Sequence, residues 1–146
     1  MDIPAFLFNL PEQNSSHYIY LVEFLNIHKD KCIPFLPWLT AEILSYAGAE
    51  KMIEVIRQYG SCRVDRNTLC DLLEGDHSLQ KIFELNCSSN NMLEVQSMSG
   101  LISDLRRFSV NFLLKRNTCP QDIVLLTGVS FRTIQRAKSQ LKDRVI

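Results

Sequence analysis

The sequence has no apolar run that approaches the roughly 20 residues of a membrane-spanning helix. Its first ten residues, MDIPAFLFNL, include an acid and no basic cluster, which is not the pattern of a secretory signal. The composition, 46% hydrophobic and 22% charged over 146 residues, is that of a globular protein with one or two small domains. These observations predict a cytoplasmic protein with no membrane partner.

The sequence is also poor in patterns that carry catalysis or hold a metal ion. Its five cysteines include no CxxC pair and its three histidines are isolated, so metal-ligand spacing is absent. No Ser-His-Asp arrangement, phosphate-cradling glycine loop or suitable carboxylate pair is present. Cys62, Cys70 and His77 are close in sequence and could suggest nucleophilic chemistry, although a surface thiol beside an unrelated histidine explains them equally well. We expect no catalytic residue, no metal and no cofactor.

The formal net charge is zero, but the charge is unevenly distributed. From residue 101 onward nine Lys and Arg face three Asp and Glu, a net charge of +6, whereas the preceding residues carry seven against thirteen, a net charge of −6. A basic end on an acidic body is typical of a phosphate-binding domain attached to another domain. We therefore predict an acidic helical dimerisation or partner domain at residues 1–95 and a basic DNA-binding domain at 96–146.

The segment 120–142 predicts two helices joined by a tight turn. Pro120 suits the first turn of a helix, where its missing N–H costs nothing. Gly128 can leave that helix with a positive φ, and Ser130 is a good N-cap for a second helix. The second helix has an apolar face, made by Phe131, Ile134, Ala137 and Leu141 at spacings of three and four. This layout is typical of a helix-turn-helix, whose second helix enters the DNA major groove.

The opposite face of the second helix carries side chains suited to reading base edges. Arg can bind guanine O6 and N7, Gln can bind adenine N6 and N7, and Thr can read either edge. Arg132, Thr133, Gln135 and Arg136 are the predicted base readers, although a hairpin whose polar face is merely solvated would have a similar pattern. Phosphate contacts are predicted for Lys115, Arg116, Thr118, Gln121, Lys138 and Lys142.

The remaining chain predicts a mostly α fold with one short strand. Further helices are expected at about 16–28, 40–47, 49–59, 68–74, 78–85 and 101–116. The second and third of these could form one helix interrupted at Gly48. Ser61–Val64 could be a strand, and no partner for it is identified in the chain. The segment 92–95 is ambiguous between strand and coil. A second copy of the strand would satisfy its backbone groups.

Three segments together resemble the Mor/C family of phage transcription activators. They are Gln58-Tyr59-Gly60 followed by Cys62–Val64, the helical Leu101–Arg106, and Gly128–Ile134. The resemblance covers roughly residues 36–142. It implies an intertwined homodimer in which Ser61, Cys62, Arg63 and Val64 form a strand that pairs across the two-fold axis. It also adds Ser130 to the base readers. The sequence departs from the family pattern at Ser61 and Asp65, and its segment 66–98 is longer.

The resemblance implies a regulator from a phage or mobile element that binds an imperfect palindrome and recruits RNA polymerase. The sequence thus predicts a sequence-specific DNA-binding transcriptional regulator, an activator, acting as a homodimer on double-stranded DNA. The alternative is a protein-interaction adaptor or anti-repressor whose helix-turn-helix does not engage DNA. The operator, the target genes and the role of 66–98 are open at this point.

Overall fold

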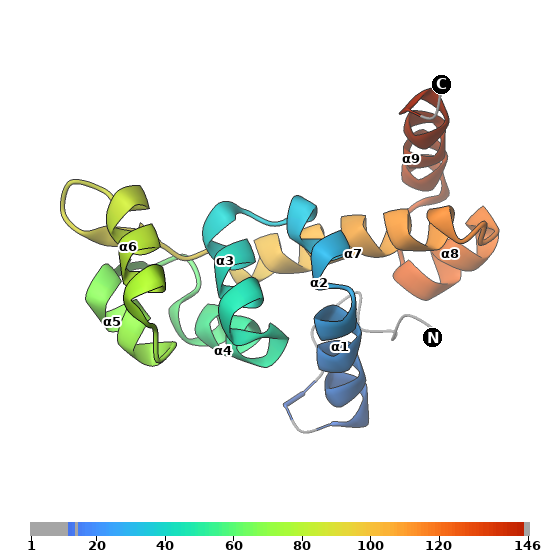
Figure 1. The fold of residues 1–146 in the computed structure, drawn as a ribbon. Helices are drawn as coiled ribbons and strands as arrows, with labels where there is room; N and C mark the ends of the chain where they lie inside the picture. Colours follow the sequence, from blue (N-terminus) through green and yellow to red (C-terminus); the bar gives the residue numbers. More distant parts are fainter. Residues whose placement is uncertain (1–11, 14, 145–146) are drawn as a thin grey trace. The chain divides into compact units, whose positions relative to one another are not determined.

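The computed structural model describes residues 12–13 and 15–144. As predicted, this part of the chain is mostly helical (Figure 1). It also contains a small sheet of two strands where the sequence predicts one. No helix within these residues is both long and apolar enough to cross a membrane. The elements are α1 (Ser16–Ile27), α2 (Lys29–Cys32), the 3-10 helix η1 (Ile33–Phe35), α3 (Trp38–Ala47), α4 (Ala49–Tyr59), β1 (Arg63–Asp65), α5 (Arg66–Leu72), α6 (His77–Asn86), β2 (Met92–Glu94), α7 (Met98–Lys115), α8 (Pro120–Thr127) and α9 (Phe131–Arg144).

The chain divides into two compact units. The first unit contains the residues up to Phe35 and those from Ile102 onward, and the second contains Leu36–Leu101. This partition differs from the predicted division at residue 95, because the N-terminal helices group with the C-terminal ones. The sequence of the first unit holds eleven Lys and Arg against seven Asp and Glu, a net charge of +4, and that of the second holds five against nine, a net charge of −4. The charge asymmetry therefore persists between the units.

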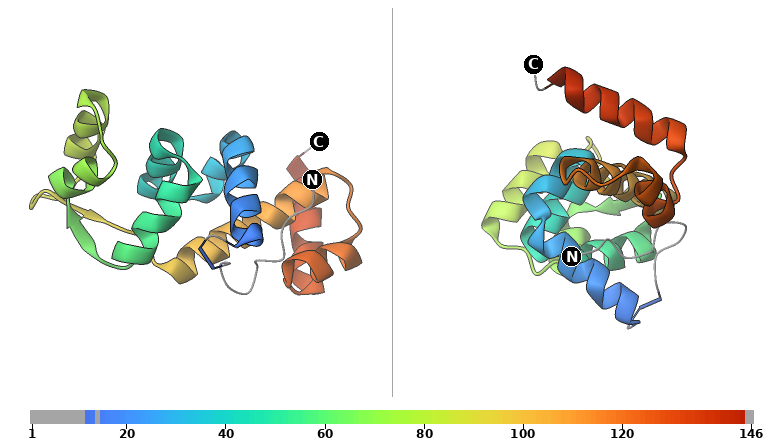
Figure 2. Two further views of the ribbon diagram at one scale, coloured as in Figure 1. Left: turned by 90° about the horizontal axis from the view of Figure 1, so that it is seen from below. Right: turned by 90° about the vertical axis from the view of Figure 1, so that its right-hand side faces the viewer.

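The first unit is built around aromatic side chains of α1 and α7. Ser15 caps the N-terminus of α1, because its Oγ accepts a hydrogen bond from the Tyr18 N–H at 3.1 Å. Phe24 of α1 lies with its ring centroid 5.1 Å from Phe112 and 5.8 Å from Phe108, both on α7. Such tilted and edge-on pairs stabilise a core beyond the area they bury. This core anchors α7, which leads to α8 and α9 (Figure 2).

The second unit contains α3 to α6 and the sheet. Gly48 has φ 93° and separates α3 from α4, so the segment forms two helices rather than one interrupted helix. These helices lie side by side in Figure 1 and supply much of the buried core. In α6, Leu79 and Phe83 are buried as the helical spacing predicts. Leu85 is 76% exposed, because it lies on the opposite face of the helix from Phe83.

The predicted strand has a partner within the chain. β1 pairs antiparallel with β2, with Val64 opposite Leu93. The Ser61 N–H also donates to the Val95 carbonyl at 3.1 Å, and the Val95 N–H donates to the Cys62 carbonyl at 2.9 Å. The expectation that the strand has no partner in the chain is therefore wrong. The partner was not recognised because β2 has only three residues, too few for an alternating pattern to be evident. Pairing of Ser61–Val64 across a two-fold axis remains a prediction, but the strand no longer needs a second copy to satisfy its backbone groups.

Candidate nucleic-acid interface

The helix pair at the C-terminal end begins and ends at the residues whose chemistry favours these positions. Pro120 is the first residue of α8, and Gly128 ends the helix in the left-handed conformation with φ 66°. The Gly128 N–H donates to the Val124 carbonyl at 2.8 Å. Only residues 128–130 separate α8 from α9. The connection is therefore short and fixes the direction in which α9 leaves.

Ser130 fixes the first turn of α9. Its Oγ accepts the Thr133 N–H at 3.3 Å and lies 2.8 Å from the Thr133 hydroxyl. The Ile134 N–H donates to the Ser130 carbonyl at 3.1 Å, which closes the first helical turn. Both hydroxyls are exposed but engaged with each other. The structure therefore gives Ser130 a capping role, and its role as a base reader remains a prediction.

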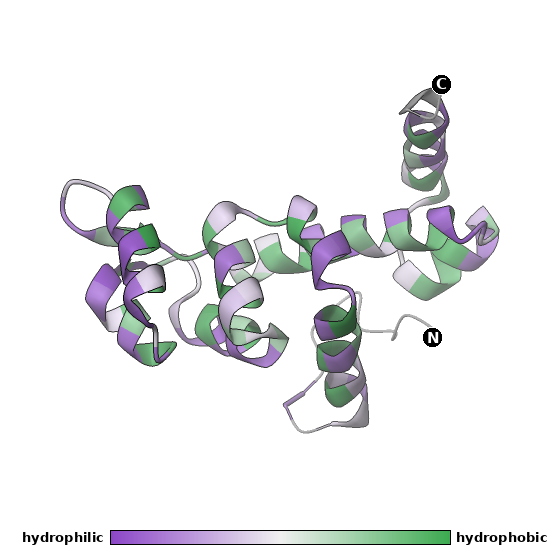
Figure 3. Cartoon of the chain, in the orientation of Figure 1, coloured by the Kyte–Doolittle hydropathy of each residue, from purple (hydrophilic) through white to green (hydrophobic). Residues whose placement is uncertain are grey.

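The contact between α8 and α9 rests on a few fully buried side chains. Ile123, Thr127 and Ile134 are each inaccessible to solvent. The Thr127 hydroxyl donates to the Ile123 carbonyl at 2.7 Å and accepts the Val129 N–H at 3.3 Å, so this buried polar group is satisfied. Phe131, expected on the apolar face of α9, is 45% exposed. The buried stripe of α9 is therefore narrower than the sequence predicts. Hydrophilic and hydrophobic residues follow one another along the helix (Figure 3).

The predicted base readers of α9 are free to meet a partner. Arg132, Thr133, Gln135 and Arg136 are all exposed. In the described part of the chain no hydrogen bond or ion pair engages the side chain of Arg132, Gln135 or Arg136. Arg132, Gln135 and Ser139 follow one another at spacings of three and four, so they share the face opposite Ile134. The centre of this face is polar and open.

One edge of this face carries the predicted phosphate contacts. A hollow of about 630 Å³ is lined by Lys115 at the end of α7, by Thr118 after it, and by Lys138 and Lys142 of α9. Two predicted residues lie outside this lysine hollow: Arg116, whose guanidinium carbon is 4.3 Å from the centroid of the Phe112 ring, and Gln121, whose Oε1 accepts a hydrogen bond from the Cys119 thiol. The structure thus brings four of the six predicted phosphate contacts together.

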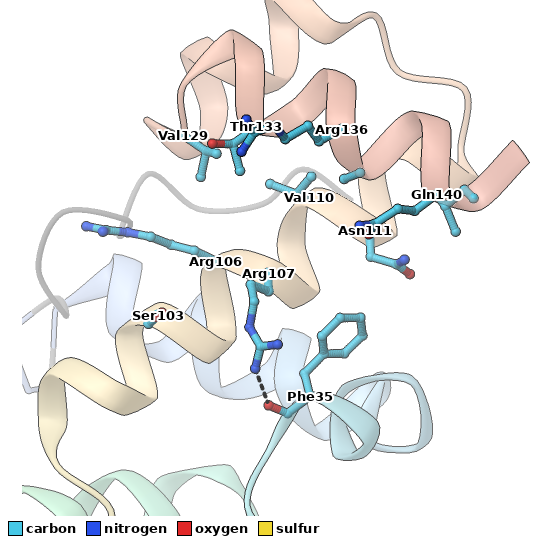
Figure 4. Close-up of a pocket in the computed structure, with 12 residues that line it drawn as sticks. Phe35, Ser103, Arg106, Arg107, Val110, Asn111, Val129, Thr133, Arg136 and Gln140 are labelled. Carbon is cyan, nitrogen blue, oxygen red and sulfur yellow. Dashed lines mark hydrogen bonds between the residues drawn. The ribbon is translucent and has the colours of Figure 1, made fainter. Parts of the chain in front are cut away.

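The other edge of the face borders a groove between α7 and α9 (Figure 4). Thr133, Arg136 and Gln140 of α9 line it, so Arg136 belongs both to the open face and to the rim of the groove. Arg106 of α7 also lines this groove, a position that was not predicted from the sequence. Its spacing of four residues from the buried Val110 was the available signal, since residues at this spacing share one face of a helix.

The structure gives little support for nucleophilic chemistry at Cys62, Cys70 and His77. Cys62 is exposed, whereas Cys70 is buried, and burial raises the pKa of the Cys70 thiol, with smaller contributions from Asp71 and Asp76. A raised pKa disfavours the thiolate that nucleophilic chemistry needs. Within residues 12–13 and 15–144, no three His, Cys, Asp or Glu side chains are grouped to hold a metal ion.

Comparisons of the chain with protein-family models, with curated proteins and with solved structures find no match.

Proposed function

We propose that the chain is a sequence-specific DNA-binding regulator of transcription that reads bases with α9. The observation that carries this proposal is the set of exposed side chains on α9, Arg132, Gln135 and Arg136, with no partner among the described residues. Each is a side chain that can bind base edges bidentately. Unpaired exposed cations and amides at the start of a helix that follows a tight turn suit insertion into the major groove.

The lysine hollow supports the same proposal through its position on α9. Lys138 and Lys142 lie on the same helix as the base readers but on a different edge. In a complex, phosphate contacts from this edge would fix the register of α9 without specifying sequence. The net charge of +4 on the first unit would favour approach to DNA, whereas the acidic second unit is unsuited to phosphate contact.

We further propose that the regulator binds a palindromic site as a homodimer. One reading helix per chain rarely binds tightly alone, and two-fold pairing places two half-sites about one helical turn apart, or a multiple of it. The resemblance to the Mor/C activators adds activation through RNA polymerase and assigns dimer formation to Ser61–Val64. In the monomer these residues already bond to the segment 91–95, so a dimer strand would use the other edge of β1.

The test is selection of bound sequences from a random DNA pool by the full chain, followed by mobility-shift measurement on the selected site. We expect an enriched palindrome with half-sites at helical-turn spacing. Enrichment of a single half-site would contradict the homodimer but not DNA reading. If no sequence is enriched and no complex forms with bulk DNA at low salt, the proposal is wrong.

The second candidate is an adaptor or anti-repressor that binds another protein. The observation that favours it is the net charge of −4 on the second unit, which suits a basic protein partner better than DNA. Such an adaptor would give no mobility shift and no salt dependence. The experiment described above therefore separates the two candidates.

A further inference from the structure

We propose that Phe131 reads the methyl group of a thymine in the major groove, so that each half-site recognised by α9 contains a thymine facing the start of this helix. The inference rests on the proposed function and names the kind of half-site that the chain binds. It is carried by the position of Phe131, by its exposure and by the side chains that follow it along α9.

Phe131 combines a position at the helix start with an open ring. It is the first residue of α9 and is 45% exposed. Within the described part of the chain, its ring pairs with no other aromatic ring. In a helix-turn-helix the N-terminal residues of the second helix contact base edges. In the proposed complex the exposed part of the ring therefore meets a base pair.

Phe131 shares one side of α9 with polar side chains suited to DNA. Gln135, Lys138 and Lys142 follow it at spacings of four, three and four, which places all four residues along one side of the helix. Gln135 can bind adenine, and the two lysines line the lysine hollow. An aromatic ring in a row of amide and cationic side chains suits an anionic partner with hydrogen-bonding groups, such as DNA, better than an apolar protein surface.

Thymine is the base that matches an apolar ring. Among the four bases only thymine carries a methyl group at its major-groove edge, whereas the other three present hydrogen-bond donors and acceptors there. A ring set against those polar groups would displace water without replacing its hydrogen bonds, which costs free energy. Against the methyl group the same ring removes apolar surface from water on both sides of the contact. The contact therefore favours thymine over the other three bases.

The spacing of Phe131 and Gln135 relates two positions of the half-site. Four residues rise about 6 Å along a helix, and base pairs follow one another every ~3.4 Å. The thymine contacted by Phe131 should therefore lie within about two base pairs of the adenine contacted by Gln135. The half-site enriched from a random pool should contain both bases at that separation.

The first experiment replaces thymine by uracil in the selected site, one position at a time, and measures the affinity of the full chain. Uracil lacks only the methyl group, so the protein and the hydrogen-bonding groups of the base pair are unchanged. We expect one thymine per half-site at which the replacement weakens binding about fourfold, the contribution of one buried methyl group. A half-site without thymine, or full affinity at every uracil position, would overturn the inference and leave the proposed function intact.

Variants assign the methyl contact to the ring of Phe131. Phe131→Ala should bind the thymine and uracil sites with equal affinity, whereas Phe131→Leu keeps an apolar side chain and should keep part of the preference. Leu85→Ala removes an exposed apolar side chain of α6, outside the proposed interface, and should keep the fourfold preference. If Phe131→Ala weakens binding of both sites by the same factor, Phe131 serves folding or a contact between subunits, and the inference is wrong.

Gln135→Ala locates the contact independently, even if Phe131→Ala does not fold. This variant should lose discrimination at one adenine, and the methyl-sensitive thymine should lie within about two base pairs of it. A sensitive thymine elsewhere in the half-site would assign the methyl contact to another side chain and overturn the inference. If the chain binds no DNA at all, the proposed function fails, and the inference fails with it.

Discussion

At the scale of single residues, neighbouring side chains of α9 have separate tasks. Ser130 and Thr133 hold the first turn, Ile134 anchors the helix in the core, and Arg132 and Arg136 are exposed and unpaired in the described part of the chain. A side chain without an internal partner contributes little to the fold. Its replacement should therefore affect binding much more than stability.

We expect Arg132→Ala and Arg136→Ala each to weaken binding of the selected site by about 1–3 kcal/mol, with little change on bulk DNA. The loss arises because a bidentate contact to a base edge is removed while the phosphate contacts stay. Titrations with the selected site and with a scrambled duplex measure both affinities, and Lys81→Ala on the exposed surface of α6 is the control. Unchanged affinity of both Arg variants would show that α9 does not read the site.

His28 connects a single residue to the pH dependence of stability. Burial lowers the pKa of His28 below its usual 6.5, and the charges of Lys31 and Arg116 lower it further. Its ring centroid lies 4.7 Å from that of Phe112 and 5.0 Å from that of Phe24. The folded state thus disfavours the proton that the unfolded chain accepts.

The free energy of unfolding should consequently fall as the pH drops below about 6.5. The loss is complete once the pH is below the lowered pKa of folded His28, and stability is retained above 6.5. We expect His28→Gln to lose less stability between pH 7.5 and pH 5 than the parent chain, as measured by urea unfolding. His77→Gln, at an exposed position of α6, is the control. An identical pH dependence for all three chains would contradict this role of His28.

At the scale of elements, the parts fixed by local chemistry could be predicted and those fixed by distant contacts could not. Pro120, Gly128 and Ser130 mark the limits of α8 and α9 in the sequence because each acts within its own turn. β2 has no such signal, since its three residues become a strand only through pairing with β1. The groove beside α9 was likewise not predictable, because Phe35 reaches it from a distant part of the chain.

The left-handed conformation of Gly128 can be tested by substitution. Its φ of 66° disfavours a residue with a Cβ, so Gly128→Ala should lower the free energy of unfolding by about 1–2 kcal/mol. Because the turn aims α9, the variant should also bind the selected DNA site less tightly. Asn tolerates this conformation better, and Gly128→Asn should lose less stability. Equal stability of the parent chain and the Ala variant would mean that the turn does not need the left-handed conformation.

At the scale of the whole molecule, the two units differ in net charge and in the segments of the chain that form them. The basic unit contains both ends of the chain, and the acidic unit is the segment Leu36–Leu101 between them. The charge difference could be predicted, because it depends only on the composition of each segment. The two compact units divide the chain differently from the predicted domains, because α1 joins α7 through the Phe24, Phe108 and Phe112 rings, a contact that no local pattern reveals.

Salt dependence can report phosphate contacts and the number of bound subunits together. Binding to duplex DNA weakens with salt by a slope of about −0.9 in log K against log [salt] for each neutralised phosphate. Lys142 lies in the lysine hollow and is exposed, so Lys142→Gln should remove one contact per subunit. A homodimer would then lose about 1.8 from the magnitude of the slope, and a monomer about 0.9.

We expect the dimer value, with selected and scrambled duplexes weakened by the same factor, since a phosphate contact does not read sequence. Lys81→Gln removes the same charge from the acidic unit and should leave the slope unchanged, because α6 lies outside the proposed interface. Sedimentation of the complex at the same protein concentration counts the subunits independently. A change of about 0.9 together with a one-to-one complex would rule out the homodimer, and no change in slope would remove Lys142 from the interface.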